Sequence, residues 1–194
     1  MKKLEFYSPD PAAHLVWPED SDAISLHSPA LSVFTDFKRH QPLVVDVHCV
    51  AAEAERLMLE AHVRLKLVVD GQRQFLGVVS LADLDTQERI KKVAEGFNRN
   101  ELTVADFMRP RDSLRVLAFQ QLAEARVMDL VEALKNNPDQ HCLVIDFGNH
   151  QIRGVISASD MARRLKLPLD INRHSSFFGI FTALHPGLQA RKVS

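Results

Sequence analysis

The chain has 194 residues, of which 46% are hydrophobic and 25% charged, an ordinary composition for a globular protein. Its 24 Lys and Arg against 25 Asp and Glu leave a formal net charge of −1 at pH 7, which argues against a general electrostatic affinity for nucleic acid. The longest apolar run, residues 177–184, is far shorter than the roughly 20 residues that a membrane-spanning helix needs. We therefore expect a protein that neither binds nucleic acid nor crosses a membrane.

The N-terminal segment carries Glu5, Asp10 and Glu19 and lacks the apolar stretch of a secretory signal peptide. Only two cysteines occur, Cys49 and Cys142, and neither has partners at the spacing of a metal site. Disulfide frameworks belong to oxidising compartments, so this cysteine usage is typical of the cytoplasm. We expect a cytoplasmic protein whose thiols pack as small apolar groups.

Composition divides the chain into four segments. Residues 1–30 contain four prolines and no lasting periodicity, which predicts an irregular N-terminal arm. Residues 31–97 and 98–167 each alternate β-rich and helical runs and are the two repeats described below. Residues 168–194 are a tail with one aromatic cluster.

The first repeat predicts the element order β-α-β-β-α. Its first helix is indicated by apolar residues at Ala54, Leu57, Met58 and Ala61, the spacing of one helix face, and Asp70-Gly71 is a hairpin signal. The expected elements are a strand at Leu43–Val47, a helix at Ala51–Ala61, strands at Leu65–Val69 and Phe75–Val79, and a helix from Ser80.

The second repeat predicts the same order. The expected elements are a strand at Leu114–Leu117, a helix at Met128–Lys135, strands at Cys142–Ile145 and Ile152–Ile156 around a turn at Gly148-Asn149, and a helix from Ser157.

The two units are an internal repeat. Aligned on Gly77 and Gly154, both read Gly-Val-apolar-Ser-x-x-Asp-apolar. The offset between the copies grows from 70 at the pairs Asp36-Phe37 and Asp106-Phe107 to 77 at the glycines, which places about six extra residues in the second copy, around residues 119–126. We expect these Asp-Phe pairs to lie in short helical leads into each copy.

The tail has apolar residues at positions 177, 180, 181 and 184, which predicts a short amphipathic helix between residues 175 and 184. This helix either docks onto its own globule or contacts a dimer partner or another protein, since exposed aromatic patches mark interfaces.

One unit of about 55 residues has a small sheet and two helices, and it exposes too much apolar surface to be stable alone. Two units that cover each other's sheets solve this problem. The expected fold is therefore α/β (α+β), with two β-α-β-β-α repeats packed by pseudo-twofold symmetry into one globule.

The repeated unit, closing in each copy on Gly-Val-apolar-Ser-x-x-Asp, resembles a pair of cystathionine-β-synthase (CBS) domains, a Bateman module, over about residues 31–167. The resemblance implies a stand-alone regulatory protein of the bacterial type that is not an enzyme. It would bind AMP, ADP, ATP or S-adenosylmethionine in clefts between the repeats, form a homodimer and signal to an unknown protein partner. The alternative is a structural or interaction module with no physiological nucleotide.

The two Ser-x-x-Asp motifs, Ser80 to Asp83 and Ser157 to Asp160, stand where a strand is expected to end and a helix to begin. A helix N-terminus suits a phosphate because its amide groups are free, and the serine hydroxyl adds a donor. The resemblance gives both aspartates the role of accepting hydrogen bonds from ribose hydroxyls. The same pattern is also a capping box, and the two roles are compatible.

The residues beside these motifs extend the candidate site. Val79 and Ile156, just before each serine, are expected to contact the adenine. Arg163 and Arg164 could offset phosphate charge, which favours the motif containing Asp160 if only one site binds a phosphorylated ligand. A solvated helix face is the alternative for these two arginines.

Lys66 and His141 lie at the start of the inner strands, in a segment that often contacts phosphates in the family. Lys66 alternates with Leu65 and Leu67, so its side chain should point away from them. The alternative for Lys66 and His141 is an exposed edge-strand position.

The nine histidines are scattered, with no two at i, i+3 or i+4 spacing, so nothing predicts a metal site. No serine or cysteine has a recognisable base, and no glycine-rich phosphate loop of the common types occurs. We expect no catalytic residues and no required cofactor.

Overall fold

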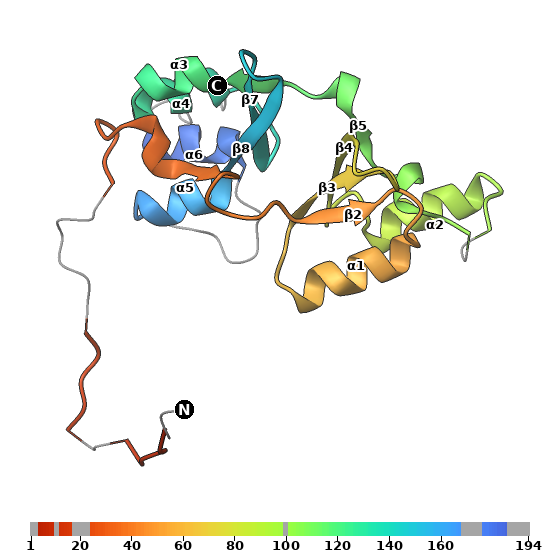
Figure 1. Cartoon of the computed structure of the whole chain (residues 1–194), viewed down its shortest axis with the longest axis horizontal. Coiled ribbons are helices and arrows are strands. Elements are labelled where there is room, and N and C mark those ends of the chain that lie inside the picture. Colours follow the sequence, from red (N-terminus) through yellow and green to blue (C-terminus); the bar gives the residue numbers. More distant parts are fainter. Residues whose placement is uncertain (1–3, 10–11, 17–23, 99–100, 168–175, 186–194) are drawn as a thin grey trace, which may run out of the picture.

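The computed structural model describes residues 4–9, 12–16, 24–98, 101–167 and 176–185. Within them the chain folds into two halves, each with a four-stranded sheet and helices (Figure 1). This mixed α/β architecture confirms the expected fold class. The described parts of the arm before residue 28 contain no helix or strand, whereas residues 1–3, 10–11 and 17–23 of the predicted arm lie outside the described residues.

The first half contains most of the first repeat. Its elements are β2 (Val44–Asp46), α1 (Ala51–Glu60), β3 (Leu65–Val69), β4 (Phe75–Ser80) and α2 (Thr86–Ala94). The second half contains β6 (Val116–Ala118), α3 (Phe119–Glu124), α4 (Val127–Leu134), β7 (His141–Asp146), β8 (Gln151–Ser157) and α5 (Ala158–Arg164).

The two halves share one strand pattern. In each, a parallel pair (β2 with β3, β6 with β7) is followed by an antiparallel hairpin (β3 with β4, β7 with β8). A parallel pair needs a crossover connection, which α1 and α4 supply. Both hairpins shift register at the same place, after Val68 opposite Gly77 and after Val144 opposite Gly154. The internal repeat therefore holds at the level of individual residue pairs.

The fourth strand of each sheet comes from the other repeat. The strand β1 (Phe34–Asp36) lies at the start of the first repeat but pairs with β8, and β5 (Arg109–Pro110) lies at the start of the second repeat but pairs with β4. At these pairings a Cβ on Gly77 or Gly154 would collide with the backbone carbonyl oxygen of Arg109 or Thr35. The repeated glycine of the motif therefore makes room for the exchanged strand.

The expected helical leads are correct for one copy and wrong for the other. Asp106 ends a short 3-10 turn (Val104–Asp106) and accepts a hydrogen bond from the Thr103 amide at 2.8 Å. Asp36 instead ends β1 and forms two hydrogen bonds with the Arg153 guanidinium, at 2.8 and 2.6 Å. These bonds hold the pKa of Asp36 at about 2. Asp36 lies opposite Gly154 as Pro110 lies opposite Gly77, so Pro110 is its true counterpart.

The extra residues of the second copy lie at the expected place. Residues 119–126 connect β6 to α4 and contain α3, whereas only residues 47–50 connect β2 to α1. The insertion at this point is therefore four residues long, fewer than the six or so that were expected here.

The helix expected from Ser157 is confirmed as α5, but the helix expected from Ser80 is not. Residues 81–84 form a turn, and α2 begins only at Thr86. The turn buries Leu84 completely. It also lets Arg89 of α2 reach Glu55 of α1, with 2.6 Å between Nη2 and Oε2.

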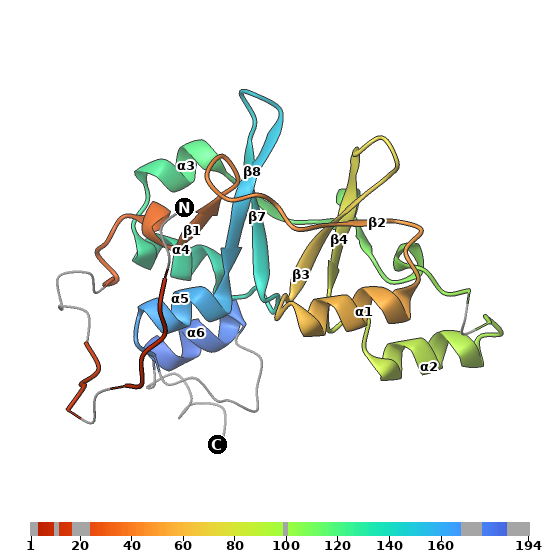
Figure 2. The ribbon, with the colours of Figure 1, turned by 60° about the horizontal axis from the view of Figure 1, so that its bottom comes forward.

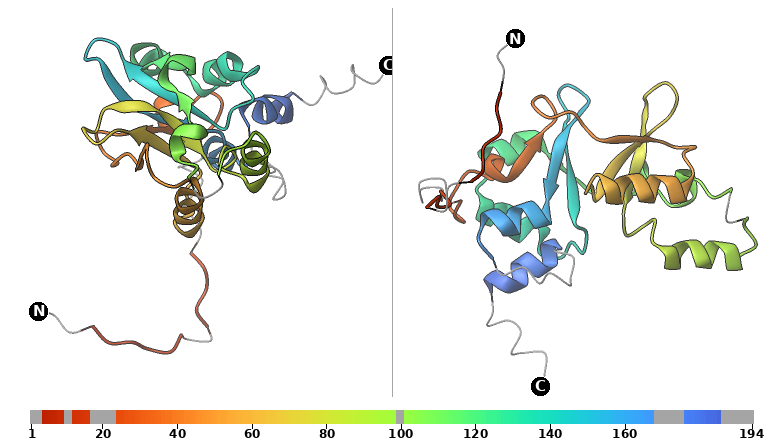
Figure 3. Two further views of the ribbon diagram at one scale, coloured as in Figure 1. Left: turned by 90° about the vertical axis from the view of Figure 1, so that its right-hand side faces the viewer. Right: turned by 90° about the horizontal axis from the view of Figure 1, so that it is seen from below.

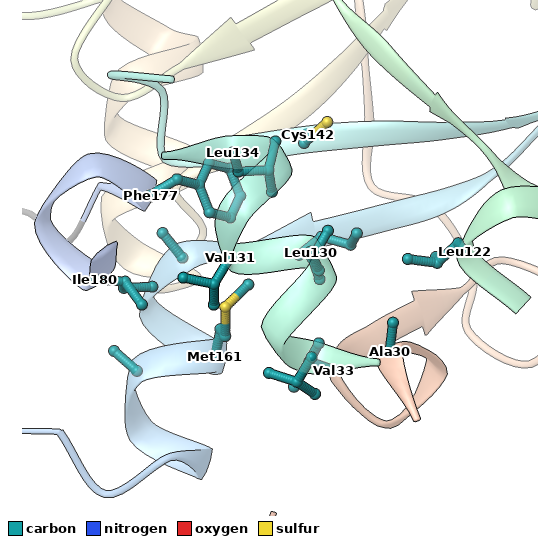
Figure 4. Packing of buried hydrophobic residues seen from close by; sticks show 14 of the residues in the cluster. Ala30, Val33, Leu122, Leu130, Val131, Leu134, Cys142, Met161, Phe177 and Ile180 are labelled. Atoms are coloured by element: carbon teal, nitrogen blue, oxygen red, sulfur yellow. The ribbon is translucent and has the colours of Figure 1, made fainter. Parts of the chain in front are cut away.

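The apolar side chains form one core in each half and a third between the two sheets. The cores of the halves lie between sheet and helices, and Figure 4 shows the larger one, in the second half. Leu67, Val78 and Leu143 centre the third core, where the β3–β4 hairpin faces β7 and β8 (Figure 2). This shared core explains why the two units form one globule.

The tail helix is confirmed as α6 (Phe177–Leu184), which packs against α4 and α5 (Figures 2 and 3). Phe177 and Ile180 are 2% and 4% exposed within the second core, and Ser176 caps the helix by accepting the Gly179 amide. The tail helix therefore docks onto its own globule, which was the first of the two expected alternatives. Residues 168–175 and 186–194 of the predicted tail lie outside the described residues.

Candidate functional site

Among the described residues, a pair of matching clefts lies where the halves meet, one beside β4 and one beside β8. The first cleft, beside β4, has a volume of about 120 Å³, and the second cleft, beside β8, about 400 Å³. The first cleft is lined by Leu65, Val78, Arg109, Ser113, Leu114, Arg115, Asp139, His141 and Leu143. The second cleft is lined by Thr35, Phe37, His40, Gln41, Leu43, His62, Val63, Arg64, Leu65, Leu67, His141, Val155 and Ser157.

The clefts are counterparts under the pseudo-twofold symmetry. Arg109 faces Val78 in the first cleft as Thr35 faces Val155 in the second. Leu65, opposite Ser80, matches His141, opposite Ser157, and both of these residues line both clefts. A ligand in either cleft would therefore contact both halves.

The second cleft combines apolar walls with hydrogen-bonding and basic groups. Phe37, Leu43 and Val155 offer apolar surface, while His62 and Arg64 offer hydrogen-bond donors at the segment between α1 and β3. A volume of about 400 Å³ lies within the usual range of small-molecule sites. These walls suit a ligand with a flat apolar part and an anionic part.

The Ser157 motif is partly engaged within its own helix. Ser157 is the N-cap of α5 and accepts a hydrogen bond from the Asp160 amide at 3.4 Å. The Asp160 carboxylate pairs with Arg163 and, at 3.2 Å, with Arg164 Nε. Arg164 also donates to the Ser32 carbonyl oxygen at 2.7 Å. Ser157 lines the second cleft, but Asp160 and the two arginines are not among its lining residues.

The Ser80 motif forms a complete capping box around a turn. The Ser80 amide and hydroxyl both donate to Asp83 Oδ2, at 2.7 and 2.6 Å, and the Asp83 amide donates back to the Ser80 hydroxyl at 3.3 Å. Ser80 is 8% exposed. In this copy the capping interpretation accounts for both residues.

Arg109 crosses the first cleft. Its Nη1 donates to Asp139 Oδ1 at 2.7 Å, and its Nε lies 3.6 Å from Asp83 Oδ2. The aspartate expected to hold a ribose in this copy is therefore bonded to Ser80 and ion-paired with Arg109. Arg109 and Asp139 were not identified as site residues from the sequence. An alignment of the two repeats that matches Asp36 with Pro110, instead of with Asp106, would have matched Thr35 with Arg109.

Val79 and Ile156, which were expected to contact the adenine, line neither cleft. Both side chains are fully buried in the cores of their own halves, away from the clefts. Because side chains alternate along a strand, it is the preceding residues, Val78 and Val155, that face the clefts.

The inner-strand residues differ from each other. Leu65 and Leu67 line the second cleft, whereas Lys66 between them does not, in line with its expected orientation. His141 is largely buried and lines both clefts. Burial, assisted by the charges of Arg109 and Arg64, lowers its pKa to about 4, so His141 is neutral near pH 7.

Other kinds of site find no support in the described part of the chain. No group of three or more His, Cys, Asp or Glu side chains there is arranged to hold a metal ion. No helix among the described residues is long and apolar enough to cross a membrane. Burial raises the pKa of the Cys142 thiol to about 11, in keeping with an inert packed cysteine.

The fold and the paired clefts define a module built from two small repeats that share a ligand-sized junction. Residues 34–86 match the family model of the CBS domain. The search of curated proteins found no significant match.

Solved structures match over most of the chain. An uncharacterized conserved protein from Pyrococcus horikoshii has a TM-score of 0.55 at 18% identity, covering 76% of this chain and 98% of its own. CBSX2 of Arabidopsis thaliana, solved in complex with AMP, has a TM-score of 0.50 at 22% identity, covering 70% and 94%. A CBS-domain protein from Agrobacterium tumefaciens has a TM-score of 0.50 at 19% identity, covering 66% and 88%. Residues 34–86 thus match the CBS domain, and the two halves together have the fold of the CBS-pair protein CBSX2.

Proposed function

We propose that the protein is a non-enzymatic regulatory module that binds an adenosine-containing ligand (AMP, ADP, ATP or S-adenosylmethionine) in the second cleft. The observation that carries the proposal is the cleft itself, about 400 Å³ at the junction of the halves with both apolar and basic lining residues. The fold shared with CBSX2, which was solved in complex with AMP, supports the ligand class.

In the proposed complex the adenine lies among the apolar side chains of Phe37, Leu43 and Val155. The phosphates face Arg64 and His62, because charge-assisted hydrogen bonds to phosphate are strong. The ribose lies towards the start of α5, near Ser157 and Asp160. Arg163 and Arg164 already pair with Asp160, so we assign them to orienting this carboxylate rather than to the phosphates.

Calorimetric titration with the four ligands tests the proposal, with Asp160→Ala as the variant. We expect binding to the unmodified chain and a large loss of affinity in Asp160→Ala. Asp83→Ala is the matched control, because Asp83 occupies the same motif position beside the first cleft. Equal affinity of Asp160→Ala and the unmodified chain would overturn the ribose assignment.

The second candidate function is a structural or interaction module without a physiological nucleotide. It is favoured by the bonding of both motifs, because a capping box accounts for Asp83 and ion pairs within α5 occupy Asp160. Thermal unfolding separates the candidates, since a ligand at 100 times its Kd stabilises the folded state by about 2.7 kcal/mol. No shift with any of the four ligands would favour the interaction module.

We also infer a cytoplasmic homodimer that signals to a protein partner of unknown identity. Exposed apolar side chains on α1 and α2 support self-association.

A further inference from the structure

We propose that Arg109 and Asp139 close the first cleft, so that each chain binds one ligand although it contains two symmetry-related clefts. This inference rests on the proposed function for the identity of the ligand. The experiment below separates the failure of one from the failure of the other.

The closure is built from three separate segments of the chain. Arg109 lies on β5, Asp139 precedes β7, and Asp83 lies in the turn after β4. The Arg109 guanidinium is 2.7 Å from Asp139 Oδ1 through Nη1 and 3.6 Å from Asp83 Oδ2 through Nε. The Arg109 side chain is 32% exposed to solvent. One cation therefore links two carboxylates across the space that a ligand would occupy.

The second cleft has no such link, because different residue types occupy the matching positions. Thr35 is the counterpart of Arg109, because Thr35 pairs with Val155 as Arg109 pairs with Val78. Val63 is the counterpart of Asp139, because Val63 lies two residues before Leu65 and Asp139 lies two residues before the matching His141. Thr35 and Val63 cannot form an ion pair, and this cleft is open to about 400 Å³ against about 120 Å³ in the first.

Charge as well as space excludes an adenine nucleotide from the first cleft. A ribose would have to displace Arg109 from Asp83, and breaking a partly buried pair leaves an uncompensated carboxylate. A phosphate entering the same space would then meet Asp139, a like charge. The Arg109 side chain thus occupies space in the first cleft that a ligand would need.

The test exchanges the lining residues between the clefts and measures stoichiometry by calorimetric titration with AMP. For the unmodified chain we expect one AMP per chain. The double variant Arg109→Thr with Asp139→Val gives the first cleft the lining of the second, and we expect two AMP per chain. The reciprocal variant Thr35→Arg with Val63→Asp should bind none. Circular dichroism and thermal unfolding establish that each variant is folded. Arg109→Gln with Asp139→Asn, which removes both charges with a smaller change of shape, serves if the first double variant does not fold, and it should also bind a second AMP.

The outcomes are distinct. Two AMP bound by the unmodified chain, or one bound by the folded opened variant, overturns the inference and leaves the proposed function standing. No AMP bound by the unmodified chain but one by the opened variant overturns the proposed function of the second cleft and supports closure of the first. Binding to neither protein overturns both.

Discussion

His141 lies at the start of β7, where both clefts meet, and is largely buried. Burial and the positive charges of Arg109 and Arg64 disfavour the imidazolium form, while Asp139 favours it to a smaller extent, and the pKa falls to about 4. An unfolded chain holds its histidines at a pKa of about 6.5. Between these two values the unfolded state binds the proton and the folded state does not.

This difference predicts that His141 makes folding stability depend on pH. Because the unfolded state takes up more protons, the free energy of unfolding should fall as the pH drops from about 6.5 to 4, by at most about 3 kcal/mol from this residue. Urea unfolding at a series of pH values measures the effect, and His141→Gln should flatten the slope within that window. The exposed His27, changed to Gln, is the control and should leave the slope unchanged. Equal slopes in the unmodified chain and His141→Gln would contradict the assignment.

Individual site residues were only partly predictable from the sequence. The motif placed Ser157 at a cleft, because a strand end and a helix start can be read from periodicity and caps. The motif could not show whether Val78 or Val79 faces the cleft, because a strand that is buried on both faces has a continuous run of apolar residues. Arg109 was missed because its position depends on a pairing between distant segments.

At the scale of elements, turn residues and apolar spacing were sufficient to predict the helices and strands whose contacts are with segments close in sequence. The hairpins and the crossover helices α1 and α4 lie where turn residues and helical spacing predict them. The exchange of β1 and β5 between sheets and the late start of α2 depend on tertiary contacts, such as the ion pair of Arg89 with Glu55. Local propensity does not encode contacts of that kind.

The docking of α6 predicts different effects for two neighbouring phenylalanines. Phe177 is 2% exposed and packs in the second core, whereas Phe178 is 51% exposed. Phe177→Ala should lower the free energy of unfolding by about 3 kcal/mol, and Phe178→Ala by less than about 0.5 kcal/mol. Urea denaturation measures both variants. Similar losses would show that the helix does not dock in this way in solution.

At the scale of the whole molecule, the pseudo-twofold symmetry is broken twice. The first cleft is crossed by Arg109 while the second is open. On the helical side, α6 covers α4 and α5 of the second half, whereas no element in the described chain packs closely in the same way on α1 and α2. The second cleft, which is the proposed ligand site, therefore lies at the junction of the halves, and the helices without a cover belong to the first half.

The bare helices predict where a second copy of the chain binds. Leu59 on α1, Ile90 and Val93 on α2 and the nearby Phe97 are between 40% and 61% exposed. Such apolar side chains mark interfaces when several occur together. The flanking residues Glu88, Lys91 and Lys92 carry both signs of charge, so a twofold-related copy can meet opposite charges.

Light scattering coupled to size-exclusion chromatography should therefore report a dimer. Changing Ile90 and Val93 together to Glu should give a monomer, because burying unpaired charges at the interface is costly. Phe147→Glu is the control, since Phe147 is 57% exposed but lies at the far hairpin turn of the second half. A dimer that survives the α2 substitutions would place the interface elsewhere, and a monomeric unmodified chain would exclude it. If AMP binding persists in the monomeric variant, the cleft and the dimer interface are independent.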